Sequence, residues 1–245
     1  VAHTQNLEAT AGKVDFSGDD VYTGLARKLG LISRKPYDGT SHPQVVDMSH
    51  IHHKLHAACA FYRSGFDTAA ALIVDGAGTF IDLQTNQQPM TVWETETIFD
   101  CNYPDTFTTK YKHLGTNGPL TTQYLKNMSS EMYDEPTSET HDVLLTENAG
   151  IVKAYEAVTE YCGFSFIEAG KTMGLFPYGD KNISVPPIFR EDTLWPIPDR
   201  QVIVPTYPNG AHVNYNFFDY LQTHDNEDVS KLENRRDMAY AIQTE

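Results

Sequence analysis

Residues 49–84 read SHIHHKLHAACAFYRSGFDTAAALIVDGAGTFIDLQ, and they combine a histidine-rich segment with two apolar segments. The histidine-rich segment also carries apolar side chains on a helical spacing, at Ile51, Leu55, Ala58 and Tyr62. This spacing predicts a helix with one apolar face. The Ser49 hydroxyl can cap its first turn, and Gly65 is placed to end it.

The segments that follow this helix have the pattern of strands. AAALIV at 69–74 is apolar, residues 75–78 are Asp-Gly-Ala-Gly, and TFIDLQT at 79–85 alternates apolar with polar residues. We expect a strand, a glycine turn and a returning strand, with MTVWETETIF at 90–99 extending the meander. Further helices are predicted over 20–31, over 151–162 and from residue 232 to the end. The order of elements predicts an α/β fold with a mixed sheet and flanking helices.

The composition is that of an ordered globular protein. The 245 residues are 40% hydrophobic and include 12 Phe and 14 Tyr. No uninterrupted apolar segment approaches the roughly 20 residues of a membrane-spanning helix, and the first residues lack a signal-peptide pattern, so we expect a cytoplasmic protein without membrane partners. The three cysteines are too few and too widely spaced for a disulfide framework, which favours reduced thiols.

The net charge of −15 argues against a nucleic-acid-binding protein. With 18 Lys plus Arg against 33 Asp plus Glu, the averaged field repels polyanions. The compact basic groupings are few and form no stripe: Arg27-Lys28 with Arg34-Lys35, the Lys110/Lys112 pair, and Arg235-Arg236. A small phosphate-containing substrate remains compatible with this charge, because backbone amides and one or two cations can bind it locally.

Four histidines within residues 50–56 are the densest chemical signal. His52 and His56 are four residues apart on the predicted helix, so their imidazoles lie on one face and can ligate one transition metal ion. The alternative is a solvated polar face enriched in histidine by chance. A zinc-protease motif is excluded, because H-E-x-x-H requires Glu where His53 stands. Cys59 could add a soft ligand, although a small buried helix residue is the better interpretation.

Two glycine-containing segments could bind an anion. The Asp75-Gly76-Ala77-Gly78 turn lets backbone amides approach a phosphate or a carbonyl, but Asp-Gly is also a common hairpin turn. EAGKTMGLFPYG at 168–179 places Lys171 between glycines and lacks the spacing of a P-loop. Its alternative is an ordinary loop with a surface lysine.

These segments together resemble the O-carbamoyltransferases of nodulation-factor and antibiotic biosynthesis. HHKLHAACAFYRSGF at 52–66 resembles the family segment H-H-x-x-H-A-x-x-A-F-x-x-S-G-F, and AALIVDGAGT at 70–79 resembles its strand ending in D-G-x-G. EAGKTMGLFPYG resembles E-x-x-K-x-M-G-L-x-x-Y-G. The resemblance covers about residues 42–180 and implies an actin-like ATPase (RNase H-like) fold. It interprets residues 1–245 as a partial N-terminal catalytic domain.

The resemblance implies an ATP-linked, metal-dependent transfer of a carbamoyl group. Carbamoyl phosphate and ATP give a carbamoyl-adenylate, whose carbamoyl group passes to a hydroxyl of a small acceptor. His52 and His56 would ligate a divalent transition metal ion, with iron expected, and Asp75 and Lys171 would be catalytic. The nucleotide and carbamoyl groups would be bound by residues of the two glycine segments, namely Gly76, Gly78, Glu168, Lys171 and Gly174. Lys171 and the Gly76/Gly78 turn should therefore converge.

The chain also departs from this family. The first phosphate loop, the later glycine-rich nucleotide block with a further carboxylate ligand, and the YrdC-like domain are not seen. We therefore expect an internal piece of a longer enzyme, and this piece can be inactive by itself. Two rival interpretations stay open. One is a tRNA threonylcarbamoyl transferase, whose glycine turn usually reads S-G-G-H. The other is a non-catalytic metal-binding module.

Overall fold

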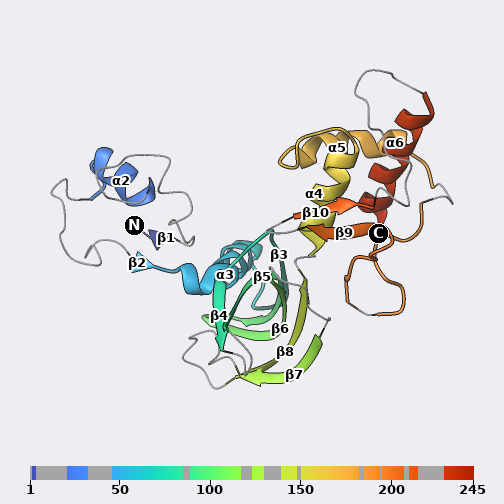
Figure 1. Ribbon diagram of the computed structural model, residues 1–245. Coiled ribbons are helices and arrows are strands. Elements are labelled where there is room, and N and C mark those ends of the chain that lie inside the picture. The colour runs from blue at the N-terminus through green and yellow to red at the C-terminus, as the bar shows by residue number, and fades with distance from the viewer. Residues whose placement is uncertain are drawn as a thin grey trace.

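A mixed β-sheet with helices beside it forms the centre of the computed structural model (Figure 1). The structure describes residues 2–3, 21–32, 46–84, 89–116, 123–129, 139–147, 150–181, 185–193, 195–206, 210–214 and 229–245. The sheet contains β3 (Thr68–Val74), β4 (Phe80–Gln84), β5 (Pro89–Asn102), β6 (Thr106–Thr116), β7 (Gln123–Ser129) and β8 (Thr140–Glu147). The strand order is β3-β5-β6-β8-β7 with β4 also on β5, and only the β6–β8 pairing is parallel. The predicted α/β class with a mixed sheet and flanking helices is confirmed, and the architecture is compatible with an actin-like fold.

The remaining elements form three groups. A short 3-10 turn η1 (Ser49–Ile51) leads into α3 (His52–Ser64), which packs on β3. The C-terminal group contains α4 (Ile151–Tyr161), α5 (Ala169–Leu175), the 3-10 turn η3 (Phe176–Tyr178), β9 (Ile203–Thr206), β10 (Gly210–Val213) and α6 (Val229–Thr244). Towards the N-terminus lie β1 (Ala2–His3), α2 (Val21–Lys28) and β2 (Val46–Asp47), with β1 parallel to β2. No helix in the described ranges has the length and apolar composition needed to cross a bilayer.

Helix α3 presents a different face to the sheet from the one that the sequence predicts. Its buried apolar side chains are Ala57 and Phe61, which pack with Ile73, Phe99 and Cys101 of β3 and β5. Burial of a side chain such as Phe61 contributes about 2–3 kcal/mol. The predicted apolar stripe and the predicted burial of Cys59 are therefore wrong, since Cys59 is exposed. The buried His53 continues the inward face at Ala57 and Phe61, so burial here follows contact with the sheet and not hydrophobicity alone.

The ends of α3 are fixed by a glycine and by a distant threonine. Gly65 ends the helix with φ +77°, a left-handed conformation that favours glycine, as predicted. The helix begins at His52, later than expected, and its N-cap residue Ile51 makes no side-chain hydrogen bond. Instead the His52 amide donates a hydrogen bond to the Thr79 hydroxyl at 3.2 Å. A tertiary contact thus holds the first turn of the helix, and the predicted Ser49 cap involves a side chain outside the described part of the chain.

Strands β3 and β4 run in the same direction along β5, so the predicted returning strand is wrong. Val74 pairs with Glu96 and Phe80 pairs with Trp93, both in antiparallel register. Residues 75–79 therefore face only Glu94 and Thr95, and they form a wide bulge in one interrupted edge strand. We refer to residues 75–79 as the 75–79 bulge. It turns the Asp75 side chain out of the ladder and towards α3.

The C-terminal group packs around a second core. Helix α4 buries Ala154, Ala157 and Val158 against β10 and α6, and α6 contributes Met238 and Ile242. Gly163 follows α4 with φ +87°, as the sequence predicts for a helix end. The segment 168–179 is mostly helical, since α5 and η3 cover most of it, so the alternative interpretation as an ordinary loop is wrong.

Candidate metal centre and its surroundings

Two histidines of α3 and one aspartate of the 75–79 bulge bring three donor atoms together. His52 Nε2 lies 3.0 Å from His56 Nε2 and 2.9 Å from Asp75 Oδ2, and His56 Nε2 lies 3.7 Å from the same oxygen. His52 is buried, Asp75 is half-buried and the His56 side chain is 56% exposed. The cluster is therefore anchored on one side and open on the other.

The spacing of these donor atoms fits a single metal ion. Two donors that each lie about 2.1 Å from one ion are about 3.0 Å apart at a right angle and about 3.4 Å apart at the tetrahedral angle. Two of the three separations match this range, and the longest one involves the exposed His56 ring, which can adjust. Two imidazoles with one carboxylate are the donor set of mononuclear non-haem iron sites with open positions.

Two polar contacts converge on one ring nitrogen of this arrangement. The Nε2 atom of an imidazole has one in-plane position, which holds either a proton or a lone pair. His52 Nε2 faces both Asp75 Oδ2 and His56 Nε2, so it cannot donate to the first and accept from the second. The hydrogen bond with His52 holds the pKa of Asp75 below its ordinary value, although burial acts in the opposite direction. Asp75 therefore offers an ionised carboxylate to a cation.

The 75–79 bulge is fixed against α3 by contacts beside this cluster. The Thr79 hydroxyl accepts the His52 amide, and Gly78 packs directly on the His53 ring. A Cβ atom at position 78 would lie 2.5 Å from His53 Nε2 and 2.9 Å from Glu94 Oε2. His53 is fully buried, and this burial lowers its pKa to about 4, so the ring is neutral near pH 7. Gly78 is thus required for close packing.

The glycine amides of the bulge already have partners within the protein. The Gly76 amide donates to Asp75 Oδ1 at 2.7 Å, and the Gly78 amide donates to the Glu94 carbonyl at 2.8 Å. In this conformation neither amide is directed at a bound phosphate. The predicted roles of Gly76 and Gly78 in binding the nucleotide or carbamoyl group stay predictions.

The structure does not bring Lys171 to the bulge. Lys171 lies on α5, where its amine contacts the Glu168 carboxylate at 2.5 Å and faces the Phe164 ring at 5.7 Å. Helix α5 belongs to the group around α4 and α6, whereas α3 lies beside the sheet (Figure 1). Gly174 is on the same helix, and nothing lies within 4 Å of a Cβ atom added there. The glycine at this position is therefore not required by close packing. The nucleotide roles of Glu168, Lys171 and Gly174 likewise remain predictions.

Lys153 of α4 is the lysine that the described residues place beside Gly76. A Cβ atom at position 76 would lie 3.5 Å from Val152 Cγ1 and 4.0 Å from both Lys153 Nζ and Glu156 Oε1. Lys153 and Glu156 form an ion pair at 2.8 Å. No sequence pattern points to Lys153, because helix α4 meets the bulge only in the folded chain.

A buried polar network lies behind the bulge, and no sequence motif indicates it. Glu94 pairs with Lys112, and Glu96 pairs with His113, in each case from β5 to β6. All four residues are at most 2% exposed. Glu96 also accepts the Ile151 amide at 2.7 Å, which joins the sheet to the first turn of α4. Burial alone raises the pKa of each carboxyl, but the attraction of Lys112 and of His113 outweighs it, and both pKa values fall below their ordinary range.

This network predicts a loss of stability in acid. A carboxyl whose pKa is lower in the folded state stabilises the fold above its unfolded pKa of about 4.3, and that contribution is lost as the pH falls through the folded pKa. We expect the free energy of unfolding of the metal-free protein to fall below about pH 4.3, and the Glu94→Gln/Lys112→Met variant to lose less. Urea unfolding between pH 7 and pH 3 measures this, with the exposed Glu191→Gln as control. An unchanged pH profile in the double variant would contradict the assignment.

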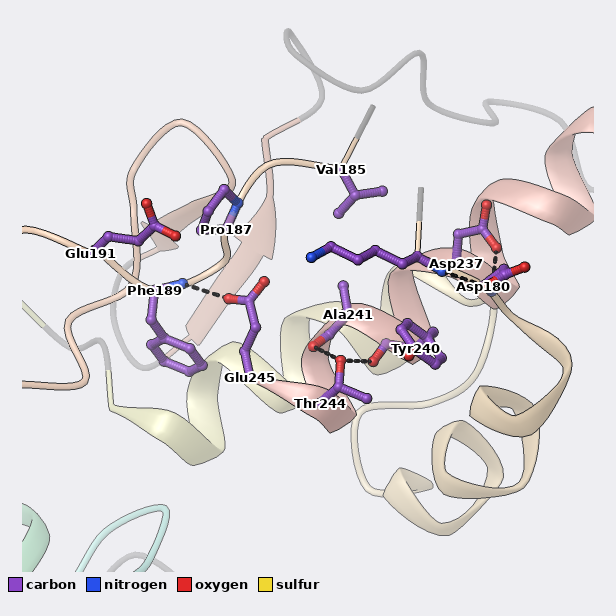
Figure 2. A pocket seen from close by; sticks show the side chains of 11 residues that line it. Asp180, Val185, Pro187, Phe189, Glu191, Asp237, Tyr240, Ala241, Thr244 and Glu245 are labelled. Carbon is purple, nitrogen blue, oxygen red and sulfur yellow. Dashed lines mark hydrogen bonds between the residues drawn. The ribbon is translucent and has the colours of Figure 1, made fainter. Parts of the chain in front are cut away.

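A pocket of about 560 Å³ lies in the C-terminal group, lined by residues of 180–191 and 237–245 and none of α3. Figure 2 shows it between the end of α6 and residues 185–191, where the Glu245 carboxylate bonds to the Phe189 amide. Its lining includes four carboxylates and one amine, those of Asp180, Glu191, Asp237, Glu245 and Lys181. None of the residues selected from the sequence lines it. The metal cluster, and not this pocket, therefore defines the candidate site.

The fold is thus an α/β fold with a mixed sheet, and a His-His-Asp cluster that could hold one metal ion lies at the edge of that sheet. The family model described as the carbamoyltransferase N-terminus matches residues 3–191. The chain belongs to the carbamoyltransferase family, and it is thus a transferase domain for carbamoyl transfer. A search of curated sequences gave no match to an individual protein. The resemblance stated from the three sequence segments is confirmed.

Proposed function

We propose that this carbamoyltransferase holds one divalent transition metal ion, with iron expected, between His52, His56 and Asp75. The convergence of their three donor atoms within 4.8 Å carries the proposal. Asp75 was expected to be catalytic, and the closeness of its carboxylate to both imidazoles supports a role as third ligand. When bound, the ion would supply Lewis-acid stabilisation of the charge that develops during acyl transfer.

The transfer itself is proposed to use a carbamoyl-adenylate made from carbamoyl phosphate, water and ATP, with release of phosphate and pyrophosphate. The hydroxyl oxygen of the acceptor attacks the carbamoyl carbon, the bond from that carbon to the AMP phosphate oxygen breaks, and the hydroxyl proton and AMP leave. The chain's own residues orient the reactants. The Asp75 carboxylate is half-buried and the His56 ring is exposed, so these two members of the cluster are the ones that a substrate could reach.

Transfer of labelled carbamoyl groups tests this proposal. The whole protein as its gene encodes it, incubated with labelled carbamoyl phosphate, ATP and a panel of small polyhydroxylated acceptors, should form a carbamate ester only when ATP is present. Asp75→Asn should reduce the rate by about 100-fold or more, since it removes a charged ligand. Metal binding without ATP-dependent transfer to any acceptor would favour the non-catalytic module.

The acceptor is proposed to be a small molecule and not a tRNA. Lys112 is buried against Glu94 and Lys110 contacts Asp100 at 3.6 Å, so this basic pair offers little to a polyanion. Arg34-Lys35 lies outside the described residues. A tRNA surface requires several exposed Lys or Arg contacts to phosphates.

Binding of tRNA at low and physiological salt checks this prediction. We expect affinity weaker than about 10 μM at physiological salt. Micromolar or tighter binding with a steep dependence on salt would favour the threonylcarbamoyl transferase interpretation instead.

A further inference from the structure

Three residues behind the metal cluster form a continuous chain of contacts that ends on its buried ligand. Lys112 Nζ bonds to the Glu94 carboxylate, and the other carboxylate oxygen of Glu94 accepts the Thr79 amide at 2.9 Å. The Thr79 hydroxyl then accepts the His52 amide at 3.2 Å. The backbone of Glu94 adds two bonds to the same bulge, from the Gly78 amide at 2.8 Å and to the Thr79 carbonyl at 3.1 Å.

These contacts constrain the two parts of the ligand set relative to each other. His52 belongs to α3 and Asp75 belongs to the 75–79 bulge, which are separate elements of the chain. Thr79 joins them, because its backbone is held by Glu94 and its hydroxyl holds the first amide of α3. Thr79 is 7% exposed and Glu94 is 2% exposed, so water does not compete strongly for these bonds.

We propose that Thr79 and Glu94 are positioning residues for the metal centre, with the Thr79 hydroxyl setting the place of His52 relative to Asp75. This inference rests on the proposed metal site. Neither residue contributes a donor atom to the cluster of His52, His56 and Asp75. Groups that orient metal ligands typically change metal affinity by 10- to 100-fold when they are removed, even though the ligands themselves remain.

Substitutions at position 79 separate positioning from simple packing. Thr79→Val keeps the shape and the backbone amide but removes the hydroxyl, whereas Thr79→Ser keeps the hydroxyl and removes only a methyl group. We expect Thr79→Val to raise the dissociation constant for Co²⁺ by about 10- to 100-fold and to alter the visible absorption of bound Co²⁺. Thr79→Ser should stay within about threefold of the wild type, since the hydroxyl that bonds to His52 is retained.

A second pair of variants keeps the test decisive if Thr79→Val folds poorly. Glu94→Gln weakens the hold on the Thr79 amide, and Glu96→Gln perturbs a carboxylate of equal burial whose partners are His113, Thr95 and Ile151. Only Glu94→Gln should weaken Co²⁺ binding, although both should lower the melting temperature.

Titration of the metal-free protein with Co²⁺, followed by absorption well below the melting temperature, gives all of these values. The predicted order is tight binding in the wild type, Thr79→Ser and Glu96→Gln, and weak binding in Thr79→Val and Glu94→Gln. Equal affinity for Co²⁺ in Thr79→Val and the wild type would overturn the positioning role but not the metal site. Failure of the wild type to bind Co²⁺ would overturn the metal site, and with it this inference.

Discussion

Replacement of Lys112 by Met is expected to lower the free energy of unfolding by about 3–5 kcal/mol, because it leaves the Glu94 carboxylate buried without its cation. Both side chains of this pair are 3% exposed, so water cannot replace the lost partner without opening the sheet. Urea unfolding measures the effect. Lys110→Met is the matched control, since Lys110 is on the same strand, half-exposed and paired with Asp100 at the surface. It should cost less than about 1 kcal/mol.

The double variant Glu94→Gln/Lys112→Met shows whether the pair itself is responsible. Without either charge, the sheet should regain a large part of the stability lost in Lys112→Met, because replacing a buried pair with neutral groups is often close to neutral. A double variant as unstable as the sum of its single variants would show that the two residues act independently.

Replacement of Gly179 by Ala is expected to cost about 3 kcal/mol, at the upper end of the range for overpacking a core. A Cβ atom there would lie 2.1 Å from the Arg236 carbonyl oxygen and 2.9 Å from Tyr240 Cβ. The nearest atoms belong to the backbone of α6, so the helix as a whole must move. Gly179 has φ −90°, which any amino acid adopts, so the expected loss of stability comes from the steric clash and not from backbone strain.

Gly174→Ala is the control for this substitution. Gly174 lies in α5 with nothing within 4 Å of its added Cβ, so alanine should stabilise the protein by about 0.5–1 kcal/mol through helix propensity. Urea unfolding of both variants gives the comparison. Equal and small effects would show that η3 and α6 are not packed as closely as described.

The fold was predictable where local signals and tertiary contacts agree. The left-handed glycines at 65 and 163 end helices as their positions indicate, and Met238 and Ile242 of the predicted C-terminal helix lie in the second core. The buried face of α3 was not predictable from apolar spacing, because His53 replaces a hydrophobic residue on it. The 75–79 bulge resembles a hairpin turn in sequence, and only its pairing with β5 shows that the chain continues forward.

Within the candidate site, too, the residues with a local sequence signal were predictable and those that depend on tertiary contacts were not. His52 and His56 could be selected because a helix places residues four apart on one face. Asp75 was selected, but its place beside them depends on the bulge. Glu94 and Lys112 could not be found in this way, since charged residues in a strand usually face solvent and their burial depends on pairing between distant strands.

Metal content of the purified protein tests the central claim most directly. After loading with Fe²⁺ under anaerobic conditions and removal of free metal, elemental analysis should find about one ion per chain in the wild type and in His50→Ala, and less than about a tenth of that in His52→Ala and His56→Ala. His50 is the matched control, because it is an exposed histidine of the same segment. Equal metal content in all four proteins would contradict the assignment of His52, His56 and Asp75 as a metal centre.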